Sequence, residues 1–284
     1  QIIDSRSTEL YNHVGSRNIF YSRSIAGHRI IWKPSKYFTF NAMETVIFGD
    51  RTIDVHYLLP FIPFWSMQHY TGDIDNVQMG GEIICSIKEK WDIYGSIFID
   101  EWRPEWTFKK NNRNWFGYQL GIFGNNILRE KDNFRAEYNW TDHRVYRHRF
   151  PINDSYSYNY ALGFWAGPNA EESYFSYNFT LKNIEIKSYF SYVKRGELTD
   201  QMLDDQYHNI IYKRNLGFSE ERKITSIILK KEIINNKIFL ETGCEWINWE
   251  NPDFNPYFPS INNSNISKFS IIIGLNAIAP ILLD

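Results

Sequence analysis

One pattern recurs along the chain: runs of about ten residues in which apolar and polar side chains alternate, each ended by residues that favour turns. In 133–140, Phe134, Ala136, Tyr138 and Trp140 alternate with Asn133, Arg135, Glu137 and Asn139. Because successive side chains of a β-strand point to opposite faces, each run has one apolar surface and one polar surface. The pattern therefore predicts an all-β protein.

Alternation and turn residues together place the strands and the connections between them. The predicted strands are 20–33, 37–48, 76–88, 91–102, 114–124, 132–142, 173–182, 184–195, 219–232, 236–248 and 268–279. Short and long connections alternate, and the long ones are 49–75, 103–113, 143–172, 196–218 and 249–267. In an antiparallel up-and-down sheet this places every long loop at one end. Outer-membrane barrels have this asymmetry, whereas Greek-key sandwiches rarely do.

The polar surface decides between a soluble sandwich and a membrane barrel. Carboxylates such as Glu82, Glu241 and Glu245 occur on many strands, and each would need a partner in a dry core. A hydrated lumen accommodates them. We therefore predict a single domain, 1–284, forming a transmembrane antiparallel β-barrel of the outer membrane with about twelve strands and extracellular long loops. Residues 7–19 supply the twelfth strand, or else it belongs to an upstream part of the barrel.

Composition agrees with this prediction. The chain contains 10 Trp, 19 Tyr and 21 Phe, and amphipathic rings are typical of membrane interfaces and of sugar-binding surfaces. No stretch approaches about eighteen consecutive apolar residues, which argues against a transmembrane helix. With 31 basic and 33 acidic residues, the formal net charge of −2 argues against nucleic acid as a partner.

Two segments depart from the simple pattern. Glu44 shares its alternation with Phe38, Phe40 and Val46, which predicts a β-bulge or an inward-facing exception there. The segment 60–65, with the sequence Pro-Phe-Ile-Pro-Phe-Trp, is too apolar for a loop left in water. We expect it to fold inward and plug the lumen, with packing on neighbouring loops as the alternative.

Several segments resemble, in order and spacing, motifs of the capsule-assembly Wzi family as found in Bacteroidota. They are 28–34, 44–49, 59–64, 75–76, 99–101, 137–138 and, above all, Leu-Gly-Phe-Trp-Ala-Gly-Pro-Asn-Ala-Glu at 162–171. The resemblance implies an outer-membrane barrel of roughly eighteen strands, of which this chain is the C-terminal part. It also implies a surface lectin that attaches capsular polysaccharide to the cell. Residues 280–284 lack the terminal aromatic residue usual in proteobacterial barrels.

A non-enzymatic polysaccharide-binding role needs flat aromatic rings for stacking and polar groups for hydroxyls. Candidates in the long loops are Trp65, Tyr70, Trp106, Trp165, Trp249, Tyr257, Arg144 and Arg147, with Arg103 and Arg113 nearby. Rings near barrel ends also form interfacial girdles, so each of these aromatics has a purely structural alternative. The basic residues of 144–149 are either a solvated loop or a contact for acidic glycan and lipopolysaccharide phosphate.

Other functions stay open as alternatives. A porin or transport channel is the first, and a barrel subunit of a larger envelope complex, whose loops contact protein, is the second. A barrel lipase would need a serine near a histidine, such as Ser155 or Ser157 with His143 or His148, but no motif joins them. We expect no cofactor. The alternating oxygens of Asp73 and Asp75 are a weak calcium signal, and we expect no metal.

Overall fold

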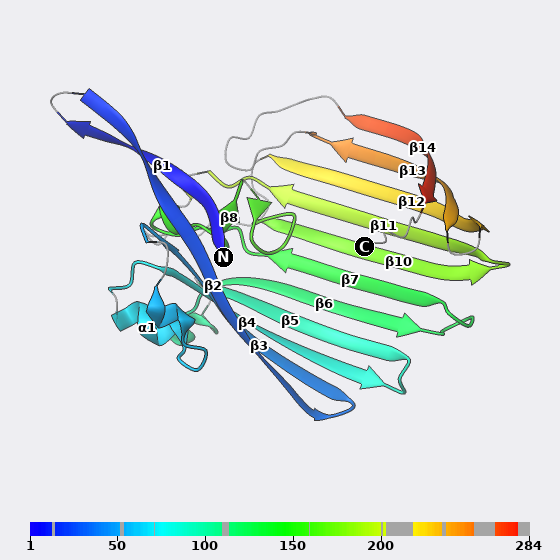
Figure 1. Cartoon of the computed structure of the whole chain (residues 1–284), viewed down its shortest axis with the longest axis horizontal. Helices are drawn as coiled ribbons and strands as arrows, with labels where there is room; N and C mark the ends of the chain where they lie inside the picture. The colour runs from blue at the N-terminus through cyan, green and yellow to red at the C-terminus, as the bar shows by residue number, and fades with distance from the viewer. Residues whose placement is uncertain are drawn as a thin grey trace, which may run out of the picture.

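The computed structural model describes residues 1–12, 15–51, 54–70, 72–109, 114–158, 160–199, 201–202, 218–234, 237–252 and 265–277, without the side chains of 6–19. Its main element is a twelve-stranded antiparallel sheet in which each strand pairs with the next strand of that sheet along the chain (Figure 1). The strands are β1 (Ile2–Asn12), β2 (Gly15–Ser35), β3 (Phe38–Gly49), β4 (Asn76–Ile87), β5 (Trp91–Glu101), β6 (Trp115–Asn125), β7 (Asn133–Thr141), β10 (Ala170–Leu181), β11 (Ile184–Gly196), β12 (Ser219–Ile234), β13 (Ile238–Glu250) and β14 (Ile266–Ala277). The predicted all-β, up-and-down architecture is confirmed.

The twelfth strand comes from the residues ahead of 20. β1 pairs with β2 from Ile2 opposite Ser24 to Asn12 opposite Gly15. Within the described residues, β1 pairs with β2 alone and β14 with β13 alone, and no ladder joins β1 to β14. The described sheet is therefore open at two edges.

Long and short connections alternate from β2 onward, as predicted. Short turns follow β2, β4, β6, β10 and β12, and long connections follow β3, β5, β7, β11 and β13. Because neighbouring strands run in opposite directions, the long connections gather at one end, here called the loop end. They carry η1 (Val55–Leu58), α1 (Phe64–Tyr70), η2 (Pro104–Trp106), η3 (Pro151–Asn153) and the short ladder of β8 (Tyr156–Ser157) with β9 (Tyr160–Ala161). None of the described helices is long and apolar enough to cross a bilayer.

The strand register places apolar side chains beside apolar ones, and polar side chains beside polar ones, across the sheet. In the β6–β7 ladder, Leu120 lies opposite Tyr138, whereas Gln119 lies opposite Asn139. The first pair belongs to what we call the apolar face and the second to the polar face. Apolar-face side chains exposed on the described structure include Ile30, Ile83, Ile93, Leu120, Phe175, Phe190, Ile227, Trp246, Ile271 and Ile273. The described sheet therefore carries a broad apolar surface on one side.

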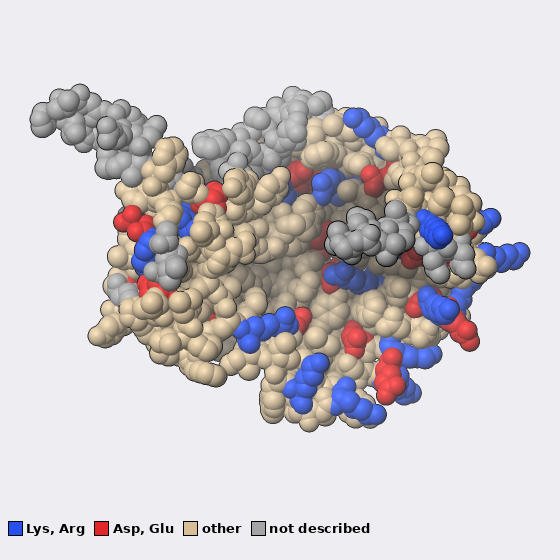
Figure 2. All heavy atoms as spheres, in the orientation of Figure 1, with Lys and Arg blue, Asp and Glu red and all other residues tan. Residues whose placement is uncertain are grey.

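The polar face is the concave one. The sheet is curved, and β2 runs at a steep angle to β10 and β11 (Figure 1). Figure 2 shows that the molecule is hollowed and that basic and acidic side chains lie along the hollow. A single cavity touches polar-face residues of seven strands, from Arg29 on β2 to Tyr174 on β10, which requires a curved surface.

The connection between β3 and β4 lies on the apolar face, so the predicted lumen plug at 60–65 is wrong. Phe64 is 1% exposed and packs with Val46, Phe48, Tyr57 and Val77. The positions of Val46 and Phe48 belong to the apolar face, because Val46 shares its alternation with Phe38 and Phe40. The apolar segment thus covers one end of an apolar surface and leaves the concave side free.

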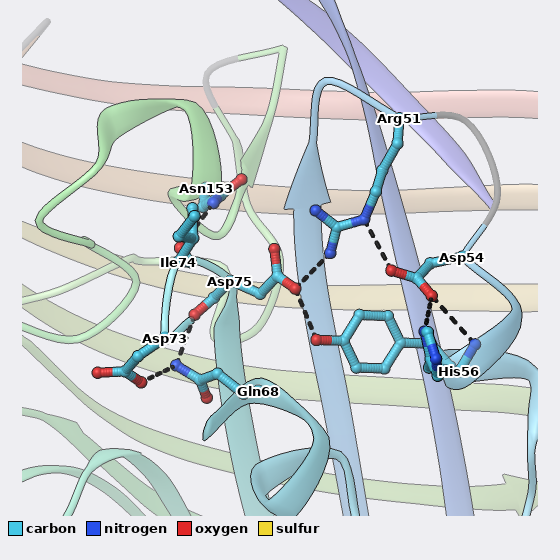
Figure 3. Close-up of polar contacts among 9 residues, drawn as sticks. Arg51, Asp54, His56, Gln68, Asp73, Ile74, Asp75 and Asn153 are labelled. Carbon is cyan, nitrogen blue, oxygen red and sulfur yellow. Dashed lines mark hydrogen bonds and ion pairs between the residues drawn. The ribbon is translucent and has the colours of Figure 1, made fainter. Parts of the chain in front are cut away.

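Polar contacts within this connection fix its two ends to each other (Figure 3). Arg51 bridges Asp54, at 2.8 Å, and Asp75. Asp75 also accepts a hydrogen bond of 2.6 Å from the hydroxyl of Tyr57. Gln68 donates to Asp73 at 3.0 Å and to the backbone oxygen of Asp75 at 2.7 Å. These contacts close the connection into a defined unit that holds α1 against the sheet.

Glu44 stays on the apolar face, and the predicted bulge or inward turn there is wrong. The register runs unbroken through Glu44 on both sides, opposite His28 and Met79. Its carboxylate accepts a hydrogen bond of 2.9 Å from the backbone N–H of Phe64 and lies 3.0 Å from Nε2 of His28. A charged group is tolerated on this face because α1 covers it and supplies a donor.

The connection between β7 and β10 lies on the polar face instead. Arg23, fully buried, reaches it from β2 and donates to the backbone oxygens of Ile152, Asp154 and Tyr156, the last at 3.0 Å. Ser155 donates to Gln78 at 3.1 Å, and Figure 1 shows β8 within the curve of the sheet. Residues of the predicted long loop 143–172 therefore fill the loop end of the hollow.

The role of Glu44 can be tested by substitution. We expect Glu44→Ala to cost about 1 to 3 kcal/mol of stability, because it removes the acceptor of a covered backbone N–H. Glu44→Gln is the matched control, since its amide oxygen can still accept from Phe64, and it should cost less. Thermal unfolding in detergent gives the stability, and limited proteolysis near α1 reports local detachment. Equal, unchanged melting and cleavage for both variants would contradict the assigned role.

Candidate functional site

A groove at the loop end brings four tryptophans together. It lies among α1, the connection between β5 and β6, and the start of the connection between β7 and β10, and its volume is about 760 Å³. Trp65, Trp102, Trp106 and Trp115 line it, with Gln68, His69 and Asn114 among the polar groups. We call it the rim groove. Indole rings beside amide and charged groups are suited to stacking on sugar rings while binding their hydroxyls.

Trp65 owes its position to the packing of α1 on the apolar face. Its neighbour Phe64 is buried, which turns the next side chain of the helix toward the groove. The ring of His69 lies 4.5 Å from the ring of Trp65, and its Nδ1 donates to the backbone oxygen of Trp65 at 3.0 Å. Trp65 is 53% exposed, so part of its surface is open to a ligand.

The connection after β5 holds two more indoles. Trp102 donates from Nε1 to the hydroxyl of Thr107 at 3.2 Å, and the guanidinium carbon of Arg103 lies 4.7 Å from the ring centre of Trp106. Asn114 accepts from the backbone N–H of Arg103 at 2.7 Å and donates to Thr107 at 3.2 Å. The amide side chain thereby fixes the turn that presents both rings.

Trp115 is the buried member of the set. It is 6% exposed and packs with Val145, Tyr146 and Tyr156. The guanidinium carbon of Arg144 lies 5.9 Å from its ring centre. Trp115 therefore connects the groove to the connection that fills the hollow, and it has little surface left for a ligand.

The basic cluster of 144–149 is held in ion pairs. Arg144 donates to both oxygens of Asp142, at 2.7 and 2.9 Å, and also to the backbone oxygen of Asn114. Burial alone would raise the pKa of Asp142, but the hydrogen bonds and charge of Arg144 outweigh it and hold this pKa below its usual value. Arg147 pairs with Asp154 at 3.0 Å. These contacts give both arginines a structural role.

The third arginine of the cluster and its histidine neighbour follow the same logic. Arg149 pairs with Asp73 at 3.0 Å and so joins this connection to the one that carries α1. Burial lowers the pKa of His148 to about 4, and Nδ1 of His148 accepts from the backbone N–H of Phe150 at 3.2 Å. His148 is therefore neutral at neutral pH and adds no positive charge to the groove.

The predicted candidates do not form one group. Trp65, Trp106 and Arg144 line the rim groove, with Arg103. Trp165 and Trp249 are linked elsewhere through Arg222, whose guanidinium carbon lies 4.6 and 5.7 Å from their ring centres. Tyr70 is 87% exposed. It lines neither the rim groove nor the cavity on the polar face of the sheet. Tyr257 and Arg113 lie outside the described residues.

Two groove residues escaped the sequence analysis. Trp102 and Trp115 stood at the ends of predicted strands, where an indole reads as part of a membrane girdle. The sequence could have indicated them only through their position, because they flank the predicted loop 103–113, which also contains Trp106. Contact between this loop and α1, which is distant in sequence, was needed to assemble the groove.

The groups considered for catalysis or metal binding have other contacts. Ser155 donates to Gln78, and His148 accepts from a backbone N–H, so these contacts do not form a serine–histidine pair. Asp73 and Asp75 bind Arg149 and Arg51. Over the described part of the chain, no group of three or more His, Cys, Asp or Glu side chains is arranged to hold a metal ion.

Comparison of the chain with protein-family models, with curated proteins and with solved structures finds no match.

The pKa of His148 predicts a dependence of stability on pH. The unfolded side chain takes up a proton near pH 6.5, whereas the folded one does so only near 4. Acidification from pH 7 to 5 therefore favours the unfolded state, and the stabilisation that depends on neutral His148 is lost as the pH falls through this window. His148→Asn keeps an acceptor for Phe150 and does not titrate.

Melting temperatures in detergent at pH 7, 6 and 5 check this. The melting temperature should fall less in His148→Asn than in the unsubstituted protein, because the variant lacks the contribution of His148. The remaining titratable groups lower it equally in both proteins. An equal fall in melting temperature for the two proteins would contradict the role assigned to neutral His148.

Proposed function

We propose that this protein is a transmembrane β-barrel of the outer membrane that binds or anchors surface polysaccharide without altering it chemically. Its partners would be outer-membrane lipid, lipopolysaccharide and capsular or related polysaccharide. The motifs that resemble those of the Wzi family support the same role. The indoles of Trp65, Trp102 and Trp106, gathered in one groove at the loop end, are the observation that carries the binding function.

The apolar face supports a membrane location. Ile271 and Ile273 on β14 are 71% and 77% exposed, and Leu120, in the middle of the sheet, is 63% exposed. Phe61, in the connection whose Phe64 packs on this face, is 95% exposed. A soluble protein rarely leaves so large an apolar surface in water, whereas hydrocarbon would cover it at no cost.

The polar face supports a closed, hydrated interior. Its charges are paired, along one strand as in Arg135 with Glu137 at 2.6 Å, and between neighbouring strands as in Arg195 with Glu220 at 2.6 Å. Paired but partly exposed charges suit a face that meets water. Closure of the curled sheet would remove its two open edges, which lipid could not satisfy with hydrogen bonds.

A porin or transport channel is the second candidate, favoured by the hollow of the polar face (Figure 2). The connection between β7 and β10 argues against an open pore, because Arg23 and Ser155 tie it to that face. Conductance in a planar bilayer separates the two: a large, steady current would favour the channel.

The membrane location predicts that the same substitution has different effects at two neighbouring residues of β6. Leu120→Arg puts a charge on the apolar face and should cost about 2 to 4 kcal/mol if that face meets the bilayer midplane. Gln119→Arg puts the same charge on the polar face and should fold almost normally. Folding into lipid vesicles, followed by heat-dependent gel mobility, measures both. A harmless Leu120→Arg would contradict insertion.

Polysaccharide binding predicts a defined loss. The double variant Trp65→Ala, Trp106→Ala should weaken binding of the producing cell's surface polysaccharide at least tenfold, because each stacked ring contributes on the order of 1 kcal/mol. Tyr70→Ala is the control, an exposed aromatic of the same helix that does not line the groove. Retained binding in the double variant, with loss in the control, would place binding outside the groove. Retention of capsule by cells that carry each variant tests the anchoring role.

A further inference from the structure

A second cavity lies on the polar face, beneath the connection between β7 and β10. We call it the polar-face cavity. Its floor is formed by β2 to β7 and β10, and its other wall by Tyr146, Gly163, Phe164 and Trp165. Its volume is about 720 Å³, within the range of about 300 to 1,000 Å³ that is usual for small-molecule sites.

Two ion pairs cancel most of the charge of this cavity. Arg29 lies 3.4 Å from Glu82, and Arg135 lies 2.6 Å from Glu137. Glu172, the third carboxylate in the lining, is 7% exposed and accepts hydrogen bonds of 2.9 Å from Trp165 and 2.8 Å from Ser191. With two guanidinium groups against three carboxylates, the cavity offers no excess positive charge to an anion.

The same groups suit hydroxyls. A carboxylate beside a guanidinium offers an acceptor and a donor side by side, which matches the paired hydroxyl groups of a sugar ring. Amides extend this set: Asn41 donates to Glu82, and Gln119 accepts from Ser96 at 3.4 Å. Asn139 also lines the cavity.

Aromatic rings complete the lining, and two of them, Trp165 and Tyr174, are held by contacts with neighbouring side chains. Trp165 is fixed at its nitrogen by Glu172, and the guanidinium carbon of Arg222 lies 4.6 Å from its ring centre. It remains 48% exposed. Arg135 lies 5.4 Å from the ring centre of Tyr174 and holds it in a similar way. Rings fixed before a ligand arrives lose little freedom on binding.

We propose that the polar-face cavity is a second saccharide site, which takes a short uncharged segment of the polysaccharide. The proposal rests on the proposed function, since it presumes that the protein binds polysaccharide. It adds a location for the site, the concave side of the sheet, and a class of ligand, neutral rather than acidic sugar. The aromatic rings would stack on the apolar faces of the sugar, and the ion pairs and amides would bind its hydroxyls.

Two glycines on adjacent strands give a matched pair of variants. Gly117 lines the cavity, and a Cβ there would meet ordinary contacts at 3.4 Å from Phe98 and 3.6 Å from Thr141. Gly95 on β5 lies opposite Leu120 on the apolar face, and its Cβ would be 3.9 Å from that side chain. Gly117→Leu therefore fills the cavity, whereas Gly95→Leu adds the same atoms on the other side of the sheet.

The test uses the full chain in detergent, with size-selected fragments of the producing cell's surface polysaccharide, separated by anion exchange into uncharged and acidic pools. Affinities come from titration calorimetry, and far-ultraviolet circular dichroism checks the fold. We expect the uncharged fragments to bind at least tenfold more weakly to Gly117→Leu and unchanged to Gly95→Leu. Should Gly117→Leu fail to fold, Trp165→Phe, which loses the bond to Glu172, should weaken binding several-fold.

The possible failures are distinct. Binding lost in the Trp65→Ala, Trp106→Ala variant but unchanged in Gly117→Leu and Trp165→Phe would overturn the cavity site and leave the proposed function standing. Tighter binding of the acidic pool would overturn the assignment to neutral sugar. No binding of either pool to the unsubstituted protein would overturn the proposed function itself.

Discussion

The two-sided character of the antiparallel sheet is the constraint on which the rest of the structure depends. Successive side chains point to opposite faces, and the register keeps Leu120 beside Tyr138 on one face and Gln119 beside Asn139 on the other. A shift of one residue in any ladder would mix the two surfaces. Curvature then makes the polar surface concave, so it can hold ion pairs, a cavity and the inward connection after β7.

Each face receives one long connection whose chemistry matches it. The connection after β3 brings Phe64 to the apolar face, and the carboxylate of Glu44 meets the backbone N–H that this packing would otherwise leave without a partner. The connection after β7 brings backbone carbonyls to the polar face, where the buried guanidinium of Arg23 binds three of them. Backbone groups thus find partners on both sides of the sheet.

The pairing of arginines shapes the chemistry of both candidate sites. Arg144, Arg147 and Arg149 in the rim region each hold a carboxylate, and Arg135 in the polar-face cavity holds Glu137. What is left for a ligand is a set of indole and phenol rings, with amides and, in the rim groove, Glu101, Arg103 and Glu105 around them. A basic run in a sequence therefore says little about anion binding until its partners are known.

The sequence by itself determined the strands, their order and their two surfaces, because alternation and turn residues act over a few neighbours and leave a local record. It also determined that the long connections share one end. Tertiary structure alone decided which face each connection covers, since Phe64 and Arg23 find partners far away in the chain. It likewise assembled Trp65, Trp102 and Trp106 in one groove. Such contacts depend on how the sheet curves, which no short stretch of sequence records.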